Sequence, residues 1–291
     1  MADIATRTER IEGHAWEDLY RGAAPHGVSV VTTSHAQVLL APRLDHLLLN
    51  RAIGLASTED VDGAVESFAE LGVSRYLVHA APGRGALRAA LAARGLARYP
   101  RSWVKLARGR GALPPARTDL EVREAAPGDA SFGAILAAGF DMPAGAAPLF
   151  DAALGRARWI TLVACEDGVP VAAALAYAEG RTGYLAGGAT LPSHRRRGAQ
   201  GALVRERVAR LLDLGCDLVV SETGESVPGD PQHSHRNLER FGLAPVYVRD
   251  NYVPAGTTWR ADARPAWHHP RHDDAEAAPL RRTRARARGA P

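Results

Sequence analysis

Cysteine, lysine and long apolar stretches are all scarce in this 291-residue chain. The two cysteines, Cys165 and Cys216, are too few for a disulfide framework or a four-ligand zinc site, and we expect no bound metal. No run of about 18 uncharged apolar residues occurs, so we expect no membrane span. The first ten residues carry charges of both signs and lack the apolar segment of a signal peptide, which favours a cytoplasmic protein.

Positive charge comes almost entirely from arginine, because Lys105 is the single lysine. The formal net charge is +4, and residues 262–291 supply +3 of it through seven arginines against four acids. The rest of the chain is therefore close to neutral. A nucleic-acid-binding protein should show a basic patch on its folded part, so we expect no nucleic-acid partner. The alternative is a nucleic-acid binder that acts through this tail.

Breaks in composition divide the chain into two expected domains. Residues 108–117 contain Gly and a Pro-Pro pair with no apolar period, which predicts a linker between domains 1–107 and 118–260. Residues 261–291 are rich in Arg, Pro and His without apolar periodicity, which predicts a disordered tail. At about 150 residues per domain, the length agrees with two domains.

Hydrophobic periodicity predicts strands alternating with helices in both halves. In the first half we expect a hairpin over 28–33 and 37–41, strands at 47–55, 75–78 and 103–106, and helices at 60–71 and 85–94. In the second half we expect strands at 120–124, 159–166, 169–178, 184–190, 217–223, 245–248 and 252–253, and helices at 129–140, 201–214 and 233–241. The similar order of elements suggests an internal duplication.

The segment 187–203 is the most informative, because a strand runs through a basic, Gly-containing loop into a helix. A helix N-terminus presents unpaired N–H groups and the positive end of its dipole, which attracts anions. Gly198 and Gly201 allow close approach, and Arg195, Arg196 and Arg197 add donors. Gly187-Gly188 lies in the preceding strand, where glycine often marks a bulge. A pyrophosphate with an extended amide arm, such as coenzyme A, suits this arrangement.

The sequence from Arg195 to Gln200, Arg-Arg-Arg-Gly-Ala-Gln, resembles the Gln/Arg-x-x-Gly-x-Gly/Ala signature of the GCN5-related N-acetyltransferase (GNAT) superfamily. The order of elements over 120–253 is also similar to that family. The resemblance implies an α/β fold with a mixed sheet, organised as two tandem GNAT-like domains, each a mostly antiparallel sheet flanked by helices. The first copy would be degenerate, because its loop 56–60, Ala-Ser-Thr-Glu-Asp, is acidic and lacks glycine and arginine.

The implied activity is transfer of an acetyl group from acetyl-CoA to the amine of a small molecule by direct attack. As catalytic residues we expect Glu222 first, then Glu225, with Tyr252 a candidate acid. The expected acetyl-CoA contacts are Gly188, Ala189, Thr190, Arg195, Arg196, Arg197, Gly198, Ala199, Gln200, Gly201, Ser234 and Asn237.

Two departures from the family pattern leave alternatives open. Gln200 stands where the signature has Gly or Ala, and Leu238 stands where many members have a Tyr that protonates the thiolate. Tyr247, Tyr252 or solvent would then supply that proton. The second hypothesis is a non-catalytic acyl-CoA-binding or scaffold protein. The sequence leaves the protein as a monomer or a homodimer.

Overall fold

The computed structural model describes residues 4–83, 85–129, 131–226 and 232–257, so the predicted tail lies outside the described residues. The helices are α1 (Ile4–Gly22), α2 (Thr58–Glu70), α3 (Gly85–Ala93), α4 (Ser131–Gly139), α5 (Ala147–Asp151), α6 (Ala199–Asp213) and α7 (His233–Arg240), with 3₁₀ turns η1 (Ala24–His26), η2 (Ala144–Ala146) and η3 (Pro192–His194). Within the described ranges, no helix has both the length and the apolar character to span a membrane.

The strands form one mixed, mostly antiparallel sheet, which confirms the predicted fold class. Its order is β1-β2-β3-β4-β12-β6-β11-β10-β9-β8-β7, with β5 paired to β12 beside this path. The parallel neighbours are β3 with β4 and β10 with β11. The strands are β1 (Ser29–Thr32), β2 (Gln37–Leu40), β3 (Arg51–Ile53), β4 (Leu77–Ala80), β5 (Leu96–Arg98), β6 (Trp103–Arg108), β7 (Glu121–Glu124), β8 (Trp159–Glu166), β9 (Val169–Glu179), β10 (Thr182–Thr190), β11 (Leu218–Gly224) and β12 (Ala244–Pro254).

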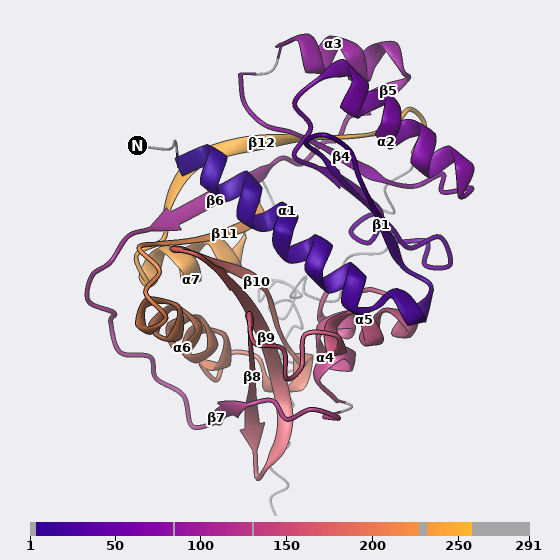
Figure 1. The fold of residues 1–291 in the computed structure, drawn as a ribbon. Helices are drawn as coiled ribbons and strands as arrows, with labels where there is room; N and C mark the ends of the chain where they lie inside the picture. The colour runs from indigo at the N-terminus through magenta and orange to yellow at the C-terminus, as the bar shows by residue number, and fades with distance from the viewer. Residues whose placement is uncertain (1–3, 84, 130, 227–231, 258–291) are drawn as a thin grey trace, which may run out of the picture.

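Strand β12 joins the two halves of the chain into this one sheet (Figure 1). Its first part, residues 244–249, pairs with β6, and residues 250–254 pair with β4 and β5. All three partner strands come from the first half, and β6 also pairs with β11 of the second half. The prediction of two separate strands here was wrong. The polar residues Arg249, Asp250 and Asn251 interrupt the apolar pattern, yet Arg249 and Asn251 are fully buried at the junction.

Helices cover both faces of the sheet. Helices α1, α4 and α5 lie on one face, where their apolar side chains form a core that extends across both halves. On the opposite face, α6 and α7 cover the second half and α2 and α3 cover the first. The sequence analysis missed α1, although Ile11, Ala15, Trp16 and Leu19 have helical spacing and are all buried.

Both halves contain the same corner of structure. An antiparallel strand, β3 or β10, leads into a helix, α2 or α6, and the chain returns as a parallel neighbour, β4 or β11. A second helix follows in each half, α3 or α7. A right-handed crossover through a helix is the usual way to connect parallel neighbours. This repeat matches the duplicated order predicted from the sequence.

Candidate functional site

Strands β10 and β11 stop pairing halfway along β10. Their parallel ladder ends at Leu185 and Ser221, and β10 shifts register against β9 between Tyr184 and Gly187. Beyond this bulge, residues 188–190 pair with β9 on one side and have no strand partner on the other within the described part of the chain. An extended ligand can hydrogen-bond to such an edge as another strand would.

Arg207 of α6 stabilises the bulge from the helix side. Its buried guanidinium donates hydrogen bonds through Nη1 to the carbonyl oxygens of Leu175 (3.0 Å) and Gly187 (2.7 Å). Burial lowers the pKa of Arg207 to about 9. A Cβ atom on Gly188 would lie 3.3 Å from Arg207 Nη2, which is a tight contact. Arg207 therefore satisfies carbonyl groups at the point where the ladder is irregular.

The start of α6 is left open by its N-cap residue. Gly198 has a left-handed backbone (φ 83°) and supplies no side chain to cap the helix. A Cβ at this position would lie 1.9 Å from the carbonyl oxygen of Arg117, so only glycine fits. The N–H groups of residues 199–201 have no acceptor within the helix, because they belong to its first turn. The structure thus provides the anion-attracting helix start that the sequence predicted.

The three arginines before this helix have different surroundings. Arg197 bonds to Glu166 (2.5 Å) and to Asp119, and these two carboxylates raise its pKa. Its charge is therefore already paired. Arg196 is exposed, and the described residues offer its side chain no hydrogen bond or ion pair, while Arg195 is half-buried. Arg196 is the arginine best placed to meet an incoming anion.

Three predicted cofactor contacts come together beside the helix start. The Gln200 side chain accepts a hydrogen bond from Asn237 (2.6 Å) and donates one to Ser234 (3.3 Å), which links α6 to α7. Gln200 is thus held against α7. Ala199 is buried, and Gly188, Ala189, Thr190 and Gly201 are half-buried.

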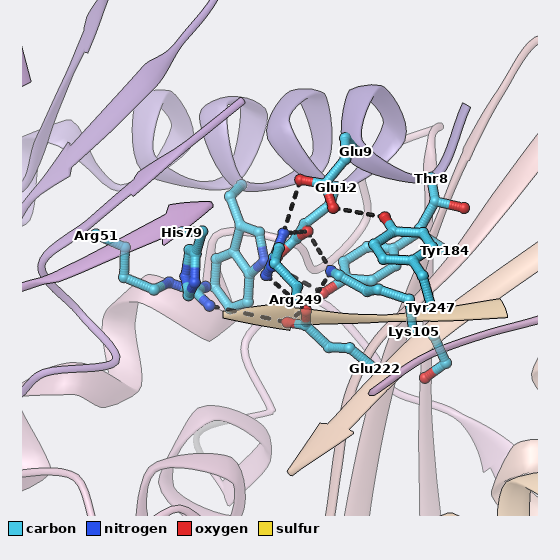
Figure 2. A network of polar contacts seen from close by, with 12 residues as sticks. Thr8, Glu9, Glu12, Arg51, His79, Lys105, Tyr184, Glu222, Tyr247 and Arg249 are labelled. Atoms are coloured by element: carbon cyan, nitrogen blue, oxygen red, sulfur yellow. Dashed lines mark hydrogen bonds and ion pairs between the residues drawn. The ribbon is translucent and has the colours of Figure 1, made fainter. Parts of the chain in front are cut away.

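Glu222 lies in a buried cluster of charges between the two halves (Figure 2). Its carboxylate binds Lys105 of β6 and Arg249 of β12, the latter at 3.0 Å. The same two cations bind Glu12 of α1, with Arg249 donating to both carboxylate oxygens at 2.5 and 2.9 Å. Glu12, Lys105 and Arg249 are buried, whereas the Glu222 side chain keeps 13% of its surface exposed.

The pKa values of Glu222 and Glu12 are shifted in opposite directions. Burial raises the pKa of Glu222, and the neighbouring Glu12 charge adds to this effect. Burial opposes ionisation of Glu12 as well, but Arg249 and Lys105 hold the pKa of Glu12 well below its usual range. Paired acids with divergent pKa values are typical of acid–base sites.

Aromatic side chains complete the cluster. Tyr184 donates a hydrogen bond to Glu222 (3.2 Å) and accepts one from Trp16 Nε1 (3.4 Å). Tyr247 donates to Glu9 (2.5 Å), which also accepts a bond from Arg249. These contacts tie α1 to β10, β11 and β12, so the position of Glu222 depends on residues from both halves.

The other two predicted catalytic residues are Tyr252 and Glu225. Tyr252 pairs with Val78 and Arg98 in the first half, and its side chain packs in the apolar core formed with α2 and α3. The structure does not bring Tyr252 to the Glu222 cluster. Glu225 is half-buried and its N–H bonds to the carbonyl of Ser102 (2.9 Å). The following residues, 227–231, lie outside the described part.

The sequence analysis missed Glu12, Arg51, Lys105 and Arg249, which surround Glu222. A usable signal was present, because Arg51 and Lys105 interrupt otherwise apolar strands where a charge would have to be buried. Glu12 similarly interrupts the apolar face of α1. The pairing of these charges was not visible, since it depends on strands from both halves meeting at β12.

Comparison with known proteins agrees with this geometry. Residues 136–242 match the family model described as Acetyltransferase (GNAT) family. The matched segment runs from α4 to the end of α7 and so includes the open edge, the helix start and Glu222. A search of curated proteins found no match.

Solved structures of similar fold include a GCN5-related N-acetyltransferase from Kribbella flavida, with 21% identity, a TM-score of 0.58 and coverage of 90% of this chain and 99% of that one. A GCN5-related N-acetyltransferase from Sphaerobacter thermophilus has 16% identity, a TM-score of 0.53 and coverage of 82% and 92%. A tandem GNAT protein from the clavulanic acid biosynthesis pathway has 15% identity, a TM-score of 0.50 and coverage of 77% and 80%. These likenesses agree in fold with the match of residues 136–242 to the acetyltransferase (GNAT) family model.

Proposed function

We propose that this protein transfers an acetyl group from acetyl-CoA to the amine of a small molecule by direct attack. Residues 118–260 would form the catalytic domain, and residues 108–117 would link it to a degenerate copy at 1–107. The observation that carries the proposal is the uncapped start of α6, which stands beside the unpaired edge of β10. Acyl transfer between two bound reactants depends mainly on holding them together, and this pair of features offers the means.

The residues present suit acetyl-CoA. The N–H groups of residues 199–201 and the Arg196 guanidinium would bind the pyrophosphate. The free edge of residues 188–190 would bind the amide arm, with Ser234 and Asn237 on the facing helix. Gly198 lets the loop pass the Arg117 carbonyl, and the Gln200 side chain is hydrogen-bonded to Asn237 of α7. Acetyl-CoA would supply a thioester whose acyl carbon the amine attacks.

Glu222 is the proposed general base. A protonated amine must lose a proton before it can attack, and a carboxylate with a raised pKa is suited to accept that proton. Glu222 follows Ser221, the last residue that pairs with β10, so it lies where the two strands separate. Lys105 and Arg249 hold its Oε2, which leaves Oε1, bonded to Tyr184, to receive the proton.

Two further requirements of the reaction are met differently. The backbone N–H of Ala189, on the free edge of β10, would donate to the oxyanion that forms on the acyl group. Leu238 is buried in the apolar core of the α6 face, so that position supplies no acid. Tyr247 is bonded to Glu9 and Tyr252 lies in the other core, so solvent would protonate the departing thiolate.

Leu238 also favours the second candidate, a non-catalytic acyl-CoA-binding protein. Without an acid at this position, binding can persist without turnover. Such a protein would bind acetyl-CoA and release no free thiol with any amine.

Isothermal titration with acetyl-CoA tests the proposal, using Gly198→Ala and the matched variant Gly180→Ala. Both glycines have left-handed backbones, but a Cβ on Gly180 meets no atom within 4 Å. Because Gly198→Ala must displace the Arg117 carbonyl, we expect its affinity to fall at least about tenfold, while Gly180→Ala binds like wild type. Thiol release with a broad panel of amines then reports transfer.

Absence of acetyl-CoA binding by the wild-type protein would overturn the proposal. Binding without thiol release from any amine would leave the acyl-CoA-binding alternative in its place.

A further inference from the structure

Arg51 of β3 is a buried cation at the edge of the Glu222 cluster. Its side chain is 2% exposed, and its Nη1 lies 3.9 Å from Glu222 Oε1, beyond hydrogen-bond distance. Its guanidinium lies over the Trp16 ring, 4.2 Å from the centroid, and 5.7 Å from that of Trp103. The other two cations of the cluster, Lys105 and Arg249, are hydrogen-bonded to carboxylates. Arg51 therefore differs from them, because its guanidinium makes no hydrogen bond to a carboxylate of the cluster.

The unpaired donors of Arg51 form one edge of its guanidinium. Both Nε and Nη2 are buried and have no hydrogen-bond partner in the described residues. These two nitrogens donate in parallel and match the two oxygens of a carboxylate. Buried donors without partners are rare in folded proteins and indicate a water, an ion or a ligand group at that place. A carboxylate is the group that satisfies both donors and the charge.

Two neighbouring side chains have unpaired groups as well. Arg249 Nε is a buried donor without a partner, and His79 Nε2 is a buried nitrogen without one. His79 Nδ1 bonds to Asn251 Oδ1 (2.7 Å), while Asn251 Nδ2 donates to the carbonyl of Arg101 (3.0 Å). His79 Nδ1 is therefore the donor. Burial and the Arg249 charge hold the pKa of His79 well below its usual range, so its Nε2 is a lone-pair acceptor.

We propose that the acceptor is an amino acid, whose carboxylate binds the Nε–Nη2 edge of Arg51 and whose amine lies at Glu222. This inference rests on the proposed function and adds the class of acceptor. A zwitterion offers both a donor and an acceptor, as the unpaired groups require, and it leaves the net charge of the cluster unchanged. The first half of the chain then has a role, since β3 supplies the residue that selects the acceptor.

The charges of the cluster favour this occupant over a simple anion. Glu9, Glu12 and Glu222 face Lys105, Arg249 and Arg51, so the ionised cluster is already balanced (Figure 2). An anion alone would add an uncompensated buried charge, which is costly. The ammonium group of an amino acid compensates its own carboxylate. The Glu222 side chain keeps 13% of its surface exposed, so solvent reaches this end of the cluster.

The experiment compares each common α-amino acid, β-alanine and 4-aminobutyrate with the amine that remains after its carboxylate is removed. Thiol release gives kcat/KM for wild type, Arg51→Met, Arg51→Lys and the control Arg75→Met. Arg75 is a half-buried arginine of the same half, paired with the exposed Asp45. For the wild type we expect kcat/KM for at least one amino acid to exceed that for its decarboxylated amine by about 100-fold. Removing one partner of a buried charged pair has an effect of this size.

In Arg51→Met this preference should fall to within about threefold of unity, and Arg51→Lys should restore part of it. Acetyl-CoA affinity should be unchanged in both, which shows an intact fold. Two results would overturn the inference. One is a wild-type preference that survives in Arg51→Met, and the other is acetylation of the amines without a carboxylate as efficiently as of the amino acids. The wild-type comparison needs no variant, so it decides the matter even where Arg51→Met does not fold.

Thermal-shift titration of the same amino acids separates the inference from the proposed function. Stabilisation by an amino acid in wild type but not in Arg51→Met supports the carboxylate site even without acetyl transfer. Absence of transfer together with absence of such stabilisation rejects both.

Discussion

The starts of α2 and α6 occupy equivalent corners of the two halves, and they differ in what satisfies them. In α2, Ser57 accepts a hydrogen bond from the N–H of Asp60, and Asp60 accepts bonds from Ala56, Ser57 and Thr33. In α6, the N-cap is Gly198 and no side chain caps the helix. The positive end of the α2 dipole therefore lies beside the Asp60 carboxylate, whereas the start of α6 has no capping side chain.

This difference shows that two equivalent helix starts in one fold can be completed in different ways. The exposed N–H groups of a helix start need an acceptor, and a side chain or a ligand can supply it. The acidic segment 56–60 supplies it internally in α2. Three substitutions test how far the contrast between the corners extends.

Lys105→Met should have the largest effect, because it breaks a buried contact between α1 of the first half and β11 of the second. Glu12 and Glu222 would lose one of the two cations they share, and removing one partner of a buried ion pair costs about 3–5 kcal/mol of unfolding free energy. Urea denaturation followed by circular dichroism measures it. Arg75→Met, which removes the ion pair with the exposed Asp45, should lower the unfolding free energy by no more than about 1 kcal/mol. Equal losses in the two variants would contradict a joined pair of halves.

Gly201→Asp should convert the α6 corner into the α2 type. Gly201 is the third residue after its N-cap, as Asp60 is in α2, and a Cβ there makes an ordinary 3.5 Å contact with Phe241. A carboxylate at this place would repel a pyrophosphate, so we expect acetyl-CoA affinity to fall about 100-fold in calorimetry. Gly201→Ala, which adds the Cβ without the charge, should bind within about threefold of wild type. Similar weakening in both variants would show a steric and not an electrostatic effect.

Asp60→Ala should have the smallest effect, a loss of about 1–2 kcal/mol from the capped α2 corner. Burial opposes ionisation, but hydrogen bonds from Thr33, Ala56 and Ser57 lower the pKa of Asp60 below its usual 3.8. Because the pKa of Asp60 is lower in the folded chain than in the unfolded chain, ionised Asp60 stabilises the fold at pH values above its unfolded-state pKa. This contribution is lost as the pH falls through its folded-state pKa.

The urea midpoint of Asp60→Ala should therefore lie furthest below that of wild type at about pH 7, and this gap should shrink below pH 3.8. Asp62→Ala, on the same helix with an exposed carboxylate, serves as the control. A gap that widens on acidification would contradict this account of the cap.

The local elements of this fold were accessible from the sequence, and the long-range pairings were not. Apolar spacing located α2, α6 and the β8–β9 hairpin within a few residues, and Gly198 indicated the open helix start. The Glu222 cluster could not be predicted, because its charges come from four strands and one helix that are far apart in the chain. Each charge taken alone interrupts an apolar element, and only the shared position of β12 shows why it is tolerated.

Because β12 of the second half pairs with β4 and β6 of the first, and β6 also pairs with β11, the two halves cannot swing apart as hinged lobes without breaking a continuous ladder. Reactants must therefore enter and leave through rearrangement of side chains and loops around a fixed frame. Because β12 is the last strand of the described residues, a ribosome must finish nearly the whole described chain before either half can complete its part of the sheet.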